Sequence, residues 1–137
     1  MKLPLKGGCI CGAIRYECNA EPMMSALCHC RQCQRSSGSA YNPLIVVPKD
    51  ALRLTGAPRY RQYTADSGST ASDGFCPDCG AHVVGKTSGM PEVMAIRVAS
   101  LDDPSGFKPQ MHIYAESAQP WDTMDAALPK FEKMPPM

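Results

Sequence analysis

The sequence has almost no excess of charge of either sign. Lysine and arginine together number 14, aspartate and glutamate 13, and charged residues make up 20% of the chain. Proteins that bind nucleic acid or a membrane surface through bulk charge carry a clear basic excess, so we expect neither partner here. Long apolar runs are missing too, both in Met1–Gly8 and further along. These absences predict a soluble, cytoplasmic protein.

Long helical patterns are also missing. Short β-prone stretches alternate with turns rich in proline and glycine, of which the chain has 13 and 11. We expect strands at residues 12–17, 41–47, 53–55, 59–64, 82–84, 92–100 and 111–115. We expect one short helical turn after His29, ended by Gly38, and a second short helix at 122–127 before Pro129. With no repeat or linker, the pattern predicts a single, mainly β domain over residues 1–137 with short antiparallel strands.

Cysteine, in contrast, is abundant, with eight residues in 137. Seven of them fall into close groups, which are Cys9 and Cys11, then the triplet of Cys28, Cys30 and Cys33, then Cys76 and Cys79. A C-x-C pair rarely closes a disulfide without strain, whereas C-x-C and C-x-x-C spacings let several sulfurs reach one metal ion. The spacing therefore indicates metal binding rather than disulfides, and zinc suits thiolate ligands.

The seven grouped cysteines divide most simply into one closed and one open site. Four thiolates close a tetrahedral zinc site, and the two separated pairs supply four. The triplet then has three ligands and a vacant fourth position. Two alternatives stay open: Cys18 joins the triplet as a fourth ligand, or a single zinc is bound and some cysteines are merely buried. We favour the first division, in which Cys18 is a buried, unligated thiol.

An open three-thiolate zinc site would suit chemistry on a thiol. The metal would ionise a thiol bound at the vacant position, whose pKa is ordinarily about 8.5. His112 is the candidate for proton transfer. His29 lies between two ligands, so we expect it to point away from the metal and make a local hydrogen bond.

Other conspicuous side chains are interpreted as structural. Trp121 is expected to cap the core, and residues 66–73 to form a polar loop or an exposed strand. Surface charges on strands are expected at Arg59, Arg61, Lys86 and Arg97.

Three stretches together carry a family resemblance: Gly8–Tyr16, Cys28–Cys33 with Gly38–Ala40, and Phe75–Gly80. Later segments, Ser100–Pro104, His112–Tyr114 and Pro120–Trp121, fit the same pattern. In these residues the chain resembles the glutathione-dependent formaldehyde-activating enzyme (GFA) family, and the match runs nearly end to end. The resemblance implies a β-rich zinc fold of the β-tent type.

The resemblance also implies roles for the cysteines. A structural zinc would be held by Cys9, Cys11, Cys76 and Cys79, and a second, catalytic zinc by Cys28, Cys30 and Cys33, which makes two zinc ions per chain. The implied reaction is the addition of the glutathione thiol to formaldehyde, giving S-hydroxymethylglutathione, which is the reaction of a carbon–sulfur lyase. The metal would either hold the ionised thiol for attack on the aldehyde or activate the carbonyl oxygen. Arg31 and Arg35 are candidates to bind the two carboxylates of glutathione. The alternative hypothesis is a zinc-stabilised binding module without catalytic activity.

Overall fold

The computed structural model describes residues 1–136, which form ten strands, one α-helix and four short 3-10 helices. The strands are β1 (Leu5–Gly8), β2 (Arg15–Cys18), β3 (Met24–Cys28), β4 (Asn42–Pro48), β5 (Leu52–Thr55), β6 (Arg59–Thr64), β7 (Thr70–Phe75), β8 (His82–Thr87), β9 (Val93–Arg97) and β10 (Met111–Ile113). The helix is α1 (Arg31–Ser37), and the 3-10 helices are η1 (Lys49–Ala51), η2 (Val98–Ser100), η3 (Pro104–Gly106) and η4 (Ala115–Ser117).

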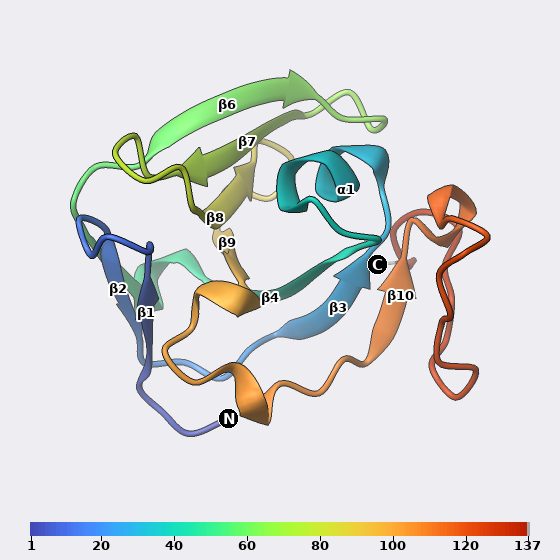
Figure 1. Cartoon of the computed structure of the whole chain (residues 1–137), viewed down its shortest axis with the longest axis horizontal. Helices are drawn as coiled ribbons and strands as arrows, with labels where there is room; N and C mark the ends of the chain where they lie inside the picture. Colours follow the sequence, from blue (N-terminus) through green and yellow to red (C-terminus); the bar gives the residue numbers. More distant parts are fainter. Residues whose placement is uncertain (137) are drawn as a thin grey trace.

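The strands form two sheets. A small sheet has the order β1-β2-β5, and a large one has the order β10-β3-β4-β9-β8-β7-β6. All pairs are antiparallel except β10 with β3, which run parallel. The large sheet curves so that α1 lies within its bend, while β1 and β2 lie outside it (Figure 1). The mainly β, β-tent class that the sequence predicts is therefore confirmed, with one parallel pair added.

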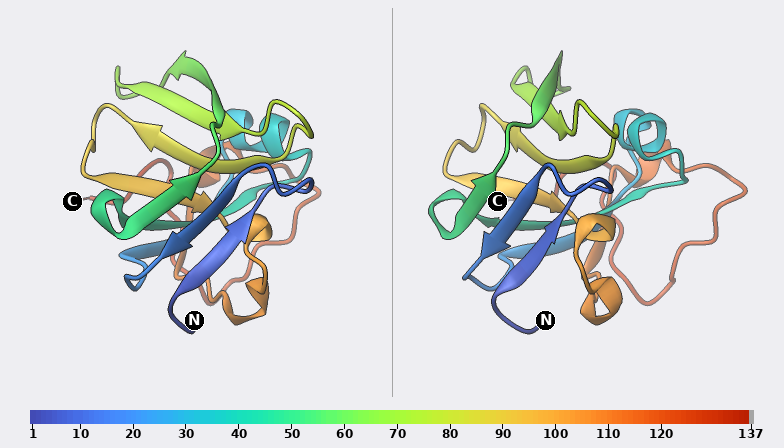
Figure 2. Two further views of the ribbon diagram at one scale, coloured as in Figure 1. Left: turned by 90° about the vertical axis from the view of Figure 1, so that its left-hand side faces the viewer. Right: turned by 60° about the vertical axis from the view of Figure 1, so that its left-hand side comes forward.

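Each face of the large sheet packs against a different layer. Because side chains alternate along a strand, Ile45 and its partner Ile96 face the small sheet, where the main core forms. Figure 2 shows the small sheet packed against the large one. On the other face, Cys28 and Ile113 form a second, smaller core with Cys33 of α1. The two cysteine-rich regions thus belong to opposite sides of one sheet.

Helix α1 begins and ends as its sequence indicates. The Cys30 sulfur is the N-cap and accepts a hydrogen bond from the Cys33 backbone N–H. Gly38 ends the helix with a φ of 69°, in the left-handed region that glycine adopts without strain. Cys30 and Cys33 therefore both lie at the start of this seven-residue helix.

Most expected strands are present, although β1 and β3 were not expected and β9 ends at Arg97 before η2. The expected helix at 122–127 is wrong, because the segment forms turns. There Asp125 accepts hydrogen bonds from the Ala127 and Leu128 backbone N–H groups, which competes with helix formation. Trp121 is also not a core residue, since 71% of it is exposed on this segment. Among residues 1–136, no helix is both long and apolar enough to cross a membrane.

Candidate metal centres

Four cysteines from distant parts of the chain, Cys9, Cys11, Cys76 and Cys79, form the four-cysteine cluster. The first two follow β1 and the last two follow β7. All four sulfurs lie within 4.8 Å of one another, and the Cys11 sulfur is 3.7 Å from those of Cys9 and Cys76. In a tetrahedral site with Zn–S bonds of about 2.3 Å, sulfurs lie about 3.8 Å apart. The cluster therefore fits a closed four-thiolate zinc site.

Backbone N–H groups point at the sulfurs of this cluster. The Ile14 N–H donates to Cys9 Sγ at 3.2 Å, and the Ala81 N–H, with that of Cys11, lowers the pKa of Cys79 to about 6. Gly80 takes a φ of 80°, which turns the chain just after the C-x-x-C pair. The turn and the N–H donors together favour the thiolate form that a zinc ion needs.

The triplet converges on the opposite side of the large sheet. Cys28 ends β3, Cys30 caps α1 and Cys33 lies in its first turn, and the three sulfurs lie within 4.8 Å of one another. The adjacent Cys28 thiol, then that of Cys33 and two backbone N–H groups, lower the pKa of Cys30 to about 3. The neighbouring thiols and N–H groups thus favour ionisation of Cys30, and soft sulfur donors at this spacing fit zinc.

The triplet has no fourth protein ligand among residues 1–136. No further histidine, cysteine, aspartate or glutamate atom joins the group of three. Cys18 is fully buried, and its thiol donates to the Ala20 carbonyl oxygen at 3.7 Å. It belongs to neither group of sulfurs, in keeping with an unligated core thiol.

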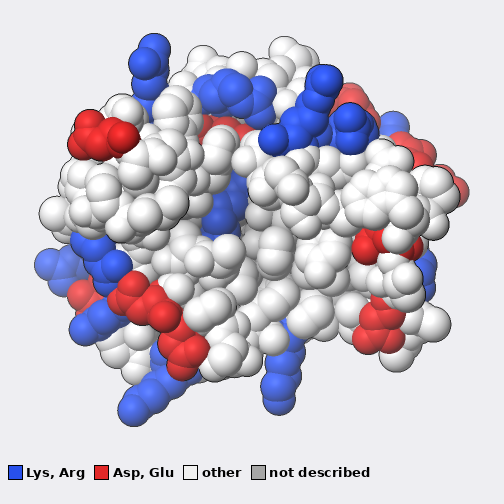
Figure 3. Space-filling view, in the orientation of Figure 1, with Lys and Arg blue, Asp and Glu red and all other residues white. Residues whose placement is uncertain are grey.

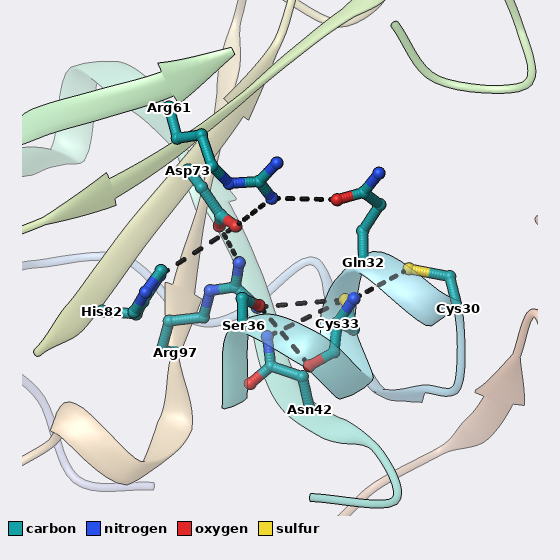
Figure 4. A network of polar contacts seen from close by, with 9 residues as sticks. All are labelled: Cys30, Gln32, Cys33, Ser36, Asn42, Arg61, Asp73, His82 and Arg97. Carbon is teal, nitrogen blue, oxygen red and sulfur yellow. Dashed lines mark hydrogen bonds and ion pairs between the residues drawn. The ribbon is translucent and has the colours of Figure 1, made fainter. Parts of the chain in front are cut away.

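A buried polar network beside the triplet was missed by the sequence reasoning. Arg97, expected at the surface, is 9% exposed and lies 3.9 Å from Cys33 Sγ, with an ion pair to the buried Asp73 (Figure 4). Figure 3 shows lysine or arginine atoms in the floor of a hollow between α1 and strands β8 and β9. Arg61 joins the network from β6, bonding Asp73 and Gln32 of α1. The alternation of residues 92–98 gave no sign of this network, because residues on both faces of β9 are buried.

Two histidines form a buried pair near the start of α1. His29 Nε2 and His112 Nδ1 are 2.8 Å apart, and Asp122 lies 3.5 Å from His29 Nδ1. Burial lowers the pKa of both histidines, which favours their neutral forms. In β10, His112 is level with Leu27 while Ile113 is level with Cys28, so His112 points to the face away from the Cys28 side chain. The hydrogen bond of His29 is therefore long-range, to a residue 83 positions along the chain, rather than the local one expected from its position.

The two arginines predicted to bind carboxylates lie on α1. Both are exposed, and the Arg31 guanidinium donates to the Gln34 side-chain oxygen at 2.5 Å. Arg35 lies in the last turn of the helix. Both positions are open to solvent close to the triplet, and their role as ligand contacts remains a prediction.

The fold is β-rich, and it brings together one cluster of four cysteines and one of three, each of which could hold a metal ion. The family model described as glutathione-dependent formaldehyde-activating enzyme matches residues 4–117. The chain therefore belongs to this family.

Similar proteins are known from fungi and from a solved bacterial structure. A Penicillium rubens protein provisionally named glutathione-dependent formaldehyde-activating enzyme is 32% identical over 80 residues, covering 57% of this chain and 41% of that protein. A Phaeosphaeria nodorum protein of the same provisional name is 34% identical over 59 residues, covering 43% and 30%. The chain thus matches less than half the length of these relatives. A Rhodobacter sphaeroides crystal structure shares the fold, with a TM-score of 0.57, 23% identity and coverage of 92% and 98%.

Proposed function

We propose that this protein is a zinc-dependent carbon–sulfur lyase-type enzyme that adds a thiol such as glutathione to formaldehyde or a related aldehyde. The observation that carries the proposal is the triplet, whose three sulfurs converge without a fourth protein ligand among residues 1–136. Catalytic zinc sites keep one position open, whereas four-thiolate sites are closed and structural. Membership of the family supports the choice of thiol and aldehyde.

The proposed reaction joins one sulfur to one carbon. The thiol sulfur attacks the aldehyde carbon, the carbonyl double bond becomes a single bond, and the thiol proton ends on the oxygen, so that formaldehyde gives an S-hydroxymethyl adduct. Zinc at the triplet would supply the positive charge that favours the ionised thiol. The eight free cysteines fit a reducing, cytoplasmic setting for this reaction.

The side chains around the triplet would divide the remaining work. Cys28, Cys30 and Cys33 would bind the zinc ion and so join the end of β3 to the start of α1. Arg31 and Arg35 would bind the carboxylates of a thiol such as glutathione, because both are exposed beside the triplet. The proposed proton-transfer role of His112 would run through its hydrogen bond to His29, which is the chain neighbour of two ligands.

The test is the rate of adduct formation by the protein loaded with two zinc ions. Exchange spectroscopy by NMR with formaldehyde and a series of thiols, including glutathione, follows free thiol and adduct at equilibrium. Addition is spontaneous, so the expected result is exchange clearly faster than in thiol and formaldehyde alone. Exchange at the background rate for every thiol would contradict the proposal and favour a zinc-stabilised binding module.

Cysteine variants test the division between the two clusters. Cys30→Ser should leave the protein folded with one zinc and no rate above background. Cys79→Ser should unfold it, because a structural zinc contributes on the order of 10 kcal/mol. Cys18→Ser is the matched control and should retain two zinc ions. Equal unfolding by the first two variants would show that the triplet is also structural.

A further inference from the structure

Arg97 is a buried arginine beside the triplet. It ends β9, and an arginine exposed to only 9% is rare unless its charge is paired. One terminal nitrogen of its guanidinium donates to Asp73 Oδ1, and the other lies 3.9 Å from Cys33 Sγ. The side chain thus connects a buried carboxylate to a candidate metal ligand, as Figure 4 shows.

Asp73 is itself held from several strands. The Arg61 guanidinium of β6 donates to Asp73 Oδ2 at 3.2 Å, and His82 Nδ1 of β8 lies 4.0 Å from the same oxygen. Arg61 also donates to Gln32 of α1 at 3.0 Å. The carboxylate that holds Arg97 in place is therefore fixed by three neighbouring elements of the large sheet and tied to the helix that carries Cys33.

Each nitrogen of the Arg97 guanidinium has a protein neighbour. One terminal nitrogen faces Asp73, the other faces Cys33, and the Asn42 amide, with its oxygen turned toward Arg97, lies against Nε and one terminal nitrogen. An arginine that bound the carboxylate of a substrate would need an open pair of N–H groups. Arg97 is therefore placed to act through Cys33 rather than on a substrate directly.

A positive charge lies directly beside the triplet, because one terminal nitrogen of Arg97 is 3.9 Å from Cys33 Sγ. We propose that Arg97 is a positioning residue that orients the Cys33 sulfur and places its positive charge beside the triplet, so that three thiolates alone hold zinc. This inference rests on the proposed function only in taking the triplet as a zinc site.

Two kinds of variant separate this role from a purely structural ion pair. The double variant Asp73→Asn/Arg97→Met removes both charges together and so avoids a buried charge without a partner. Asp73→Asn alone keeps the positive charge beside Cys33. Arg97→Lys keeps the charge but loses the planar fork that reaches Asp73 and Cys33 together.

The experiment measures zinc affinity at fixed pH in the full chain by competition with a chromophoric chelator. In the double variant the triplet should bind zinc about 10- to 100-fold more weakly, the usual effect of losing a group that supports a metal ligand. Asp73→Asn and Arg97→Lys should each lose less than about tenfold. The four-cysteine cluster should retain its zinc in every variant and so reports that the fold is intact. With cobalt(II) in place of zinc, sulfur-to-metal absorption from the triplet should weaken most in the double variant.

A double variant that binds zinc at the triplet as tightly as the unmodified chain would overturn the inference. A loss in Asp73→Asn or Arg97→Lys as large as in the double variant would do so too, because the ion pair, not the charge beside Cys33, would then matter. An unmodified chain that binds a single zinc would end both this inference and the proposed function. Two bound zinc ions without faster adduct exchange would end the proposed function alone.

Discussion

Replacing Asp73 by asparagine should destabilise the protein far more than the same change at Asp102. Asp73 pairs with Arg97 and also with Arg61, whereas Asp102 pairs with Arg15, and the Asp73–Arg97 pair differs from the Asp102–Arg15 pair in burial. The side chains of Asp73 and Arg97 are 4% and 11% exposed, whereas those of Asp102 and Arg15 are 51% and 44% exposed. The protein therefore contains its own comparison between a buried and an exposed Arg–Asp pair.

The expected magnitudes follow from this burial. Removing one partner of a buried pair leaves an uncompensated charge and destabilises by about 3–5 kcal/mol. Asparagine retains an oxygen that accepts from Arg97, so we expect about 3 kcal/mol for Asp73→Asn. An exposed pair is screened by water and contributes about 0–1 kcal/mol, which is the expected loss for Asp102→Asn.

Urea unfolding of the zinc-loaded protein, followed by circular dichroism, measures both losses. With a denaturant dependence of about 1–3 kcal/mol per molar, the Asp73→Asn midpoint should fall by about 1–3 M. The Asp102→Asn midpoint should move by a small fraction of that. Similar losses for the two variants would refute the reasoning from burial, and a double variant with Arg97→Met that is no more stable than Asp73→Asn would refute the role of the uncompensated charge.

Two further predictions concern pH and the core. Burial lowers the pKa of His29, His82 and His112, so the unfolded chain binds more protons below about pH 6.5. Stability should therefore be lost as pH falls below that value, with a shallower fall in His112→Gln, and an identical slope in the variant would contradict the assignment. Ile45→Ala, at a fully buried position, should lower the free energy of unfolding by about 2–5 kcal/mol, whereas Ile10→Ala, at 85% exposure, should change it by less than about 0.5 kcal/mol.

The cysteine spacings were informative because local geometry determines which sulfurs can meet. The triplet spans six residues, and Cys76 and Cys79 share one turn, so neighbouring sulfurs must lie close whatever the rest of the chain does. The contact of Cys9 and Cys11 with Cys76 and Cys79 is long-range. It was predicted from the preference of zinc for four ligands. Chemistry, rather than strand periodicity, thus predicted the long-range contact.

The buried network could not be predicted in the same way. Both faces of β9 are covered, one by the small sheet and the other by α1, so alternation in residues 93–97 does not distinguish a surface from an interior position. The partner of Arg97 lies 24 residues away on another strand, at Asp73. Likewise, the three residues of β10 carry no sign of their parallel pairing with β3, which decides the face on which His112 lies.

The two ends of the seven-stranded sheet differ in a way that bears on self-association. At one end, residues 129–133 hydrogen-bond to His112, Tyr114 and Ala115, so the chain's own tail covers β10. At the other end, β6 bonds only to β7 and leaves its outer backbone groups unpaired by another strand of residues 1–136. An uncovered edge strand of this kind can pair with a strand from a second molecule, and the exposed charge of Arg59 disfavours such pairing.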